Sequence, residues 1–167
     1  MEAPIIRTDD HLLRKFTKKQ LLISIISNMI INGIVPWYNF EDKHAVHLFR
    51  GAQPLARYVL PMAVFLPFFI TLDILRKTIA LLEENNAGLL FPPHLPKNKF
   101  LFKTSAINAT ITLSIILCLM LGLHISLPDN YTFDGTVLAI VSGLLGGAMA
   151  VIFVLQPINK VKKLYPD

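Results

Sequence analysis

Long apolar stretches alternate with short polar segments along the chain, and this alternation predicts its architecture. A helix needs about 20 predominantly apolar residues, within a range of about 17–25, to cross the hydrocarbon of a bilayer. Stretches of that length occur four times: Gln20–Pro36, Leu55–Leu75, Ala106–Leu123 and Val137–Leu155. Backbone groups in lipid must be paired within their own segment, so these stretches are expected to be helices. The pattern therefore predicts an all-α integral membrane protein with four transmembrane helices, at about 20–37, 55–76, 104–124 and 136–156.

The composition favours a membrane protein over a soluble domain. Hydrophobic residues make up 53% of the chain and charged residues 16%, and the mean hydropathy is +0.54. Soluble domains carry about 25% charged residues. In a soluble protein the net charge of +5 would suggest a nucleic-acid partner, but basic residues at the ends of membrane helices contact anionic lipid headgroups instead. The expected partner is therefore the lipid bilayer, and no nucleic acid is expected.

The basic residues are distributed unevenly between the predicted helices. Thirteen of the sixteen lie in residues 1–19, in residues 76–103 or in the C-terminal tail. The remaining three are Lys43, Arg50 and Arg57. Loops rich in Lys and Arg stay on the cytoplasmic side of a membrane. We therefore expect both termini and the central loop in the cytoplasm, in a protein of the cell (inner) membrane.

The two halves of the sequence resemble each other when the chain is shifted by 84 residues, half its length. The shift superposes the first helix on the third and the second on the fourth. Pairs that then coincide are Lys19 and Lys103, Phe49 and Phe133, and Gly51 and Gly135. This predicts a parallel duplication, in which two like-oriented hairpins, 1–84 and 85–167, form one membrane domain.

A resemblance to a known family follows from the same half-repeat. The first half begins with Lys18, Lys19 and Gln20, continues into a helix rich in Ser, Met and Asn, and closes its proline-bearing second helix with Arg76 and Lys77. This resembles a small two-helix bacterial inner-membrane domain of unknown function, which occurs singly or doubled. The resemblance implies a bacterial inner-membrane location, and it carries no activity and no catalytic residue across.

Polar side chains recur on one face of the first helix and on one face of the third. They are Ser24, Asn28 and Asn32 on the first helix, and Ser105, Asn108 and Thr112 on the third. Residues three or four apart share a helix face. Two such faces turned toward each other would form a polar seam through the bundle. Amides in a membrane either fasten helices together or line a substrate path, and both interpretations stay open.

Small residues form two adjacent rows on the fourth helix. One row holds Ala139, Gly143 and Gly147, and the other holds Ser142, Gly146 and Ala150. Small residues at a spacing of four let helices approach closely. The rows therefore predict a tight helix contact, either with another helix of this chain or with another subunit.

Two groups of titratable residues could carry chemistry. Glu41, His44 and His47 in the first outer loop are candidate ligands for zinc or another transition metal, and a simple solvated loop is the alternative. His124, Asp129 and Asp134 in the second outer loop could add ligands. Asp73, near the inner end of the second helix, suggests either cation coupling or a local ion pair with Arg76 or Lys77.

No motif in the chain indicates an enzyme or a cofactor. The sequence has no glycine-rich phosphate loop, CxxC pair, HExxH or GxSxG motif. Our leading hypothesis is a non-enzymatic multi-pass membrane protein, a small transporter or channel-like unit that acts as an oligomer, with the amide faces along the path. The alternative is a structural or regulatory accessory subunit of a membrane complex, which docks through the fourth helix and the segment Leu89–Lys103.

Overall fold

The computed structural model describes residues 6–51, 53–85, 91–92, 95–128 and 130–164, and this part of the chain forms four long helices. Their bounds are Ile6–Asn39 for α1, Leu55–Asn85 for α2, Lys97–Ser126 for α3 and Gly135–Lys162 for α4. All four are long and apolar enough to cross a membrane. The prediction of an all-α, four-helix, multi-pass membrane protein is confirmed.

The helices extend beyond their apolar stretches. α1 has 34 residues, which corresponds to about 51 Å at about 1.5 Å per residue. The hydrocarbon of a bilayer is only about 30 Å thick, so the polar first turns of α1 project beyond it or the helix tilts. α3 begins at Lys97, earlier than predicted, because Lys97–Lys103 contains no glycine or proline that would interrupt a helix.

Prolines lie inside three of the helices, α1, α2 and (as Pro157) α4, instead of ending them. Pro36 was expected to close the first helix, but it lies one turn before the end of α1. The N–H of Phe40 donates to the Pro36 carbonyl at 3.0 Å, and this bond closes the last turn. α2 likewise continues through Pro61 and Pro67. Membrane helices tolerate such residues because neighbouring helices satisfy the backbone groups that a proline leaves unpaired.

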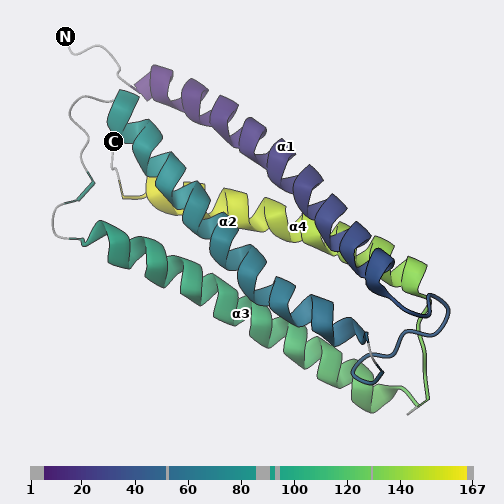
Figure 1. Cartoon of the computed structure of the whole chain (residues 1–167). Helices are drawn as coiled ribbons and strands as arrows, with labels where there is room; N and C mark the ends of the chain where they lie inside the picture. The colour runs from purple at the N-terminus through teal and green to yellow at the C-terminus, as the bar shows by residue number, and fades with distance from the viewer. Residues whose placement is uncertain (1–5, 52, 86–90, 93–94, 129, 165–167) are drawn as a thin grey trace, which may run out of the picture.

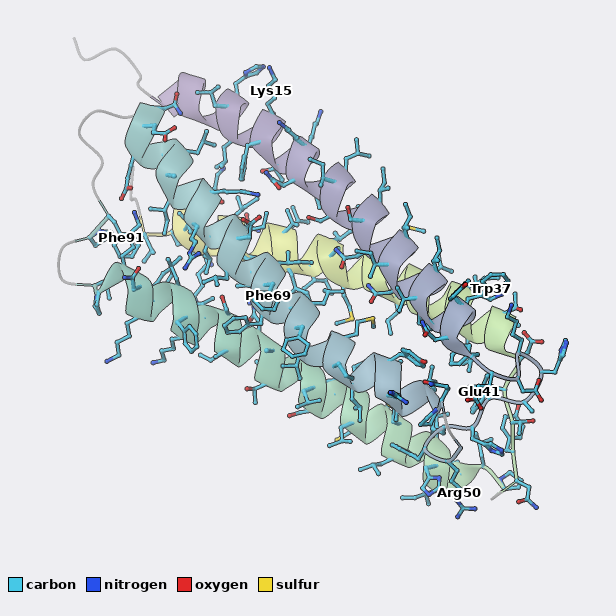
Figure 2. The ribbon with its side chains drawn as sticks, in the orientation of Figure 1. Lys15, Trp37, Glu41, Arg50, Phe69 and Phe91 are labelled. Carbon is cyan, nitrogen blue, oxygen red and sulfur yellow. The ribbon has the colours of Figure 1, made fainter. Side chains whose placement is uncertain are left out.

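α1 and α3 run antiparallel to α2 and α4 (Figure 1). α1 and α3 begin, and α2 and α4 end, at one end of the bundle, which we call the basic end because most of the lysines lie there. The connections from α1 to α2 and from α3 to α4 lie at the opposite end, the loop end. Figure 2 shows Lys15 at the basic end, and Trp37, Glu41 and Arg50 at the loop end.

The helices pack in the order α1, α4, α2, α3. α1 lies mainly against α4, α2 lies between α4 and α3, and α1 meets α2 over a shorter length. The backbones of α3 and α1 do not approach each other, and neither do those of α3 and α4. α2 and α3, which follow each other in the chain, are therefore close partners, whereas α1 packs mainly on α4, the helix farthest from it in the sequence.

Glycines make the contact between α4 and α1 unusually close. A Cβ added at Gly143 would lie 2.9 Å from the carbonyl oxygen of Met29. A Cβ at Gly147 would lie 2.6 Å from Cγ of Met29, and one at Gly146 would lie 2.6 Å from Nδ2 of Asn32. Ala139 and Ala150, in the same rows, are buried. The small face of α4 thus lies against α1 of the same chain.

At the loop end, the two connections pair with each other. The N–H of Val46 donates to the Phe133 carbonyl, and the N–H of Phe133 donates to the Val46 carbonyl, both at 2.9 Å. The N–H of Gly135 donates to the Lys43 carbonyl at 2.6 Å. An apolar cluster beneath them joins the loops to α2 and α3, and its buried members are Phe40, Val46, Leu48, Leu55, Ala56, Val59, Ala63, Ile116 and Met120. The loop end is therefore a packed cap.

Gly143→Ala is expected to lower the free energy of unfolding by about 1–3 kcal/mol, the usual effect of overpacking. The new methyl group would collide with the backbone oxygen of Met29, which cannot turn aside. Unfolding by SDS in mixed micelles, followed by circular dichroism, measures the change. Gly122→Ala on α3 is the matched control and should be neutral or slightly stabilising, because nothing lies within 4 Å of its new Cβ. Equal destabilisation of the two variants would contradict the close α1–α4 contact.

Candidate functional site: a polar cluster at the basic end

Side chains from three helices meet at Asn108. Its amide nitrogen Nδ2, on α3, donates to Oγ1 of Thr71 on α2 at 3.0 Å and to Oε1 of Gln156 on α4 at 2.6 Å. In return, Nε2 of Gln156 donates to Oδ1 of Asn108 at 3.2 Å. The side chains of Thr71 and Asn108 are buried. The two amides therefore form a paired contact between α3 and α4, with Asn108 buried and Gln156 exposed.

A second contact joins α3 to α4 one turn nearer the basic end. Nζ of Lys160 donates to Oγ1 of Thr104 at 3.3 Å and lies 5.7 Å from the centre of the Phe100 ring. Thr104 precedes Asn108 by four residues on α3, and Lys160 follows Gln156 by four on α4, so the two contacts stack along one pair of helices. Because the backbones of α3 and α4 stay apart, these side chains bridge the gap between them.

The two contacts lie at different depths in a bilayer. The apolar part of α4 begins near Val137, and about 20 helical residues cross the hydrocarbon, so Gln156 lies at its edge. Lys160 lies four residues further, or about 6 Å along the helix. That distance places it in the headgroup layer, which extends about 5–8 Å beyond the hydrocarbon. Uncharged amides thus lie at the edge of the hydrocarbon, and the charged group lies outside it.

The expected polar seam does not form. Its residues were Ser24, Asn28 and Asn32 on α1, and Asn108 and Thr112 on α3, but α1 and α3 do not touch because α4 and α2 lie between them. Nδ2 of Asn28 donates to the Ser24 carbonyl at 2.7 Å, and Nδ2 of Asn32 donates to the Asn28 carbonyl at 2.8 Å. The Thr112 hydroxyl likewise donates to the Asn108 carbonyl at 2.8 Å. Among these five residues, Asn108 is the one that hydrogen-bonds to other helices.

Asn32 faces a small cavity between α1, α2 and α4. The cavity has a volume of about 80 Å³, and its wall includes Asn32, Pro36, Tyr58 and Ser142. Pro36 has no N–H, so the Asn32 carbonyl lacks its usual donor within the helix. The hydroxyl of Ser142, a residue 6% exposed, forms no hydrogen bond with any described residue. The cavity thus offers polar groups to water or to a small polar solute.

Glu41, His44 and His47 do not come together as a metal site. Among the described residues, no group of three His, Cys, Asp or Glu side chains could hold a metal ion. Nδ1 of His44 lies 3.9 Å from Oδ2 of Asp134, but the His44 side chain is 91% exposed. The Asp134 carboxylate instead caps α4 by accepting two N–H bonds from its first turn, each 2.9 Å long. Asp129 lies outside the described residues.

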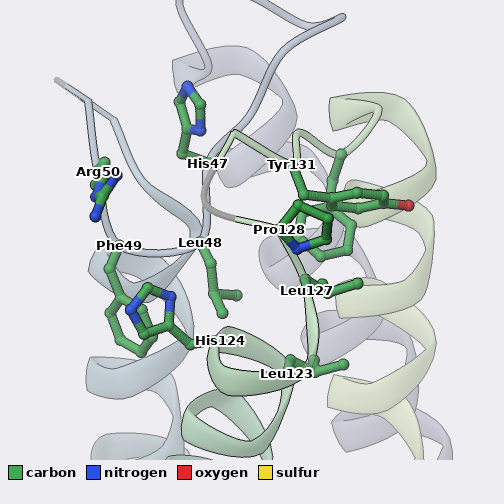
Figure 3. Close-up of a pocket in the computed structure, with 10 residues that line it drawn as sticks. His47, Leu48, Phe49, Arg50, Leu123, His124, Leu127, Pro128 and Tyr131 are labelled. Carbon is green, nitrogen blue, oxygen red and sulfur yellow. The ribbon is translucent and has the colours of Figure 1, made fainter.

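His47 and His124 border a pocket of about 30 Å³ at the loop end (Figure 3). The rings of Phe49 and His124 meet edge to face, with their centres 5.3 Å apart. Figure 3 shows the His47 ring directed away from both of them. The described lining residues include no carboxylate, so the two histidines have no acidic partner in this pocket. A pocket of this size holds about one water molecule.

Two other expectations concern the basic end. Asp73 forms the local ion pair, because Nζ of Lys77 lies 2.6 Å from its Oδ2 and both side chains are about half exposed. Nζ of Lys97 lies 2.9 Å from Oε2 of Glu83 and ties the first turn of α3 to α2. The suggested docking segment Leu89–Lys103 overlaps α3, and part of it lies outside the described residues.

Sequence reasoning missed Thr71, Thr104, Gln156 and Lys160 as parts of this cluster. A signal was nevertheless present, because Gln156 interrupts the apolar run of α4 one turn before Lys160. The same spacing of four separates Thr104 from Asn108 on α3. Matching these two spacings in antiparallel order would have predicted both contacts between α3 and α4.

No family model matches the chain, and neither does a curated protein or a solved structure. The resemblance to a two-helix inner-membrane domain stays a prediction. The function is therefore argued from the geometry alone.

Asn108→Leu is expected to lower the free energy of unfolding by about 1–2 kcal/mol, because it removes the bonds to two other helices and leaves the Gln156 amide unpaired. Ser114→Ala is the matched control on α3. Its exposed hydroxyl donates to a carbonyl of its own helix, so the change should stay within about 0.5 kcal/mol. A double-mutant cycle with Gln156→Leu should give a coupling energy of about 0.6–1.7 kcal/mol. Purely additive effects would contradict the amide pair.

Proposed function

We propose that this protein is a non-enzymatic subunit with a structural or regulatory role, which assembles with partners in the bilayer through α1. The supporting observation is how few residues of α1 are buried. In its most apolar part, 6% of the residues are buried within the chain, against 39% for α2 and 56% for α4. The close glycine contact holds α1 on α4 along one face. α1 is therefore firmly attached and presents most of its circumference to the membrane.

The exposed surface of α1 suits another helix. Its large exposed apolar side chains include Leu22, Ile23, Ile26, Ile30, Ile31 and Ile34. Beside them, a groove of about 360 Å³ runs between α1 and α4, with Gly33, Ala139 and Gly143 in its wall and Trp37 at the loop end. Ridges of side chains on one helix fit into grooves of its neighbour. Small residues at helix contacts are what drives association in lipid, so this groove supports assembly.

The orientation follows from the charges. The basic end carries thirteen of the sixteen Lys and Arg residues, and the three others lie near the loop end. The positive-inside tendency favours a cytoplasmic basic end, with both termini inside the cell. In a bacterium the membrane would be the inner one, as the resemblance implies. Protease access to a C-terminal tag in inverted vesicles, and its protection in right-side-out vesicles, checks this orientation.

The packing order supports a duplicated origin. In the duplication, α1 corresponds to α3 and α2 corresponds to α4. Exchanging the corresponding helices in the packing order α1, α4, α2, α3 gives α3, α2, α4, α1, which is the same order read from the other end. A two-fold relation between the halves 1–84 and 85–167 has this property. Each half then contributes one outer helix and one central helix, and the outer helix of each half packs on the central helix of the other.

Replacement of Ile30 by Trp tests the assembly. The exposed Ile30 lies on the outward side of α1, where lipid tolerates the larger ring but a packed neighbour does not. In a mild detergent, the full chain should migrate as a complex larger than its 18.8 kDa monomer, and Ile30→Trp should weaken this association about tenfold, equivalent to about 1.4 kcal/mol. Leu119→Trp, at an exposed position on α3, is the matched control and should leave the complex intact. A chain that is monomeric at native expression levels in membranes contradicts the proposal.

A small transporter or channel-like unit is the second candidate, and the cavity whose wall includes the Asn32 amide and the Ser142 hydroxyl favours it. The path would then include this cavity between α1, α2 and α4, with the Asn32 amide along it. Uptake of small polar solutes into liposomes that contain the wild-type chain, and loss of this uptake in Asn32→Leu with folding intact, would support this candidate over the first. Equal uptake by both proteins would exclude a path along Asn32.

A further inference from the structure

We propose that the surface between the basic ends of α3 and α4 binds the phosphate group of an anionic phospholipid, with the Lys160 ammonium as its main ligand. Thr104 is a positioning residue in this site, because its hydroxyl accepts a hydrogen bond from Nζ of Lys160 at 3.3 Å. This bond holds the ammonium across the gap, where the backbones of the two helices stay apart. The site is independent of any contact that α1 makes with a partner.

The charges around Lys160 favour an anion. Its ammonium has three N–H donors, and it forms one hydrogen bond to a described residue and no ion pair with a described carboxylate. The carboxylates of Asp73 and Glu83, on the half of α2 that ends at the basic end, are already paired with other lysines. Lys103, which is exposed, lies next to Thr104 on α3. A second cation therefore lies within the same turn of α3 as Thr104, where it would add to the attraction of a phosphate bound at Lys160.

The depth and the neighbouring surface favour a lipid over free phosphate. Lys160 lies about 6 Å beyond the edge of the hydrocarbon, in the layer where the headgroups of lipids lie. Ile111 follows Asn108 by three residues on α3, and Ile152 precedes Gln156 by four on α4, so both lie on the faces that border the gap. Their side chains are 54% and 58% exposed. They offer an apolar surface to acyl chains directly below the phosphate position.

Native mass spectrometry of the full chain in detergent micelles tests the site. The probes are phosphatidylglycerol and phosphatidylcholine with identical acyl chains, and the dissociation constant of the first bound lipid is measured for each. We expect the wild-type chain to prefer phosphatidylglycerol. Lys160→Gln should weaken phosphatidylglycerol binding about fivefold, the equivalent of about 1 kcal/mol for one lysine near the membrane surface. Its effect on phosphatidylcholine should be negligible, and Lys160→Arg should retain the preference.

Lys19→Gln is the matched control, because it removes the same charge from an exposed position on α1 at the same end of the bundle. Lys19→Gln should leave the affinity for phosphatidylglycerol unchanged. If it lost as much affinity as Lys160→Gln, the attraction would be a diffuse effect of positive charge, and the proposed site would be overturned. Lys103→Gln should also weaken binding. Because this variant leaves the contact between Lys160 and Thr104 in place, it tests the site even if Lys160→Gln folds poorly. Unchanged affinity in Lys103→Gln and Lys160→Gln would likewise overturn the proposal. Displacement of the lipid by millimolar inorganic phosphate would assign the site to a soluble anion instead.

Discussion

Helices in a bilayer gain nothing from burying apolar side chains against one another, because lipid tails are as apolar as leucine, so close fit and hydrogen bonds must hold them together. In this protein the fit of α1 on α4 is the contact on which much else depends. It brings the Asn32 side chain over Gly146 and leaves a small cavity beside Ser142. It also sets α1 at the margin of the bundle, outside the contact between α2 and α3.

α3 is held by a different kind of interaction. It packs on α2, where Phe68 and Phe102 meet with ring centres 5.3 Å apart, and its hydrogen bonds to α4 come from polar side chains. The amide pair and the contact between Lys160 and Thr104 follow the change in polarity along the membrane normal, from a neutral pair to a solvated cation. Because side chains make this contact, polar groups stay exposed at the basic end. In the α1–α4 contact, by contrast, the glycines of α4 lie directly against α1.

Hydropathy alone predicted the number, the order and the approximate bounds of the helices, because the thickness of the hydrocarbon imposes a length on any apolar segment that crosses it. The neighbours of each helix were harder to predict. Every lipid-facing and every helix-facing apolar side chain carries the same signal, and the seam expected between Asn32 and Asn108 failed for this reason. The glycine rows on α4 did predict a close contact, but α1 was not identifiable as the partner because Gly33 stands without a small residue four positions away. Asn108 was identified as a candidate, whereas its partner Gln156 was not, because it follows the apolar run of α4 as a single polar residue.

The separation of packing partners along the chain bears on how the protein is made. α1 is complete at Asn39, yet α4 begins only at Gly135, and at a synthesis rate of about 5–20 residues per second the ribosome needs roughly 5–20 s to cover that distance. During this interval α1 has to remain in the lipid without its neighbour. The amides of Asn28 and Asn32 donate to carbonyls of their own helix, and such bonds exist as soon as the helix itself exists. α1 can therefore remain inserted in the membrane before α4 is synthesised, and nascent chains stalled before α4 should carry a stably inserted α1.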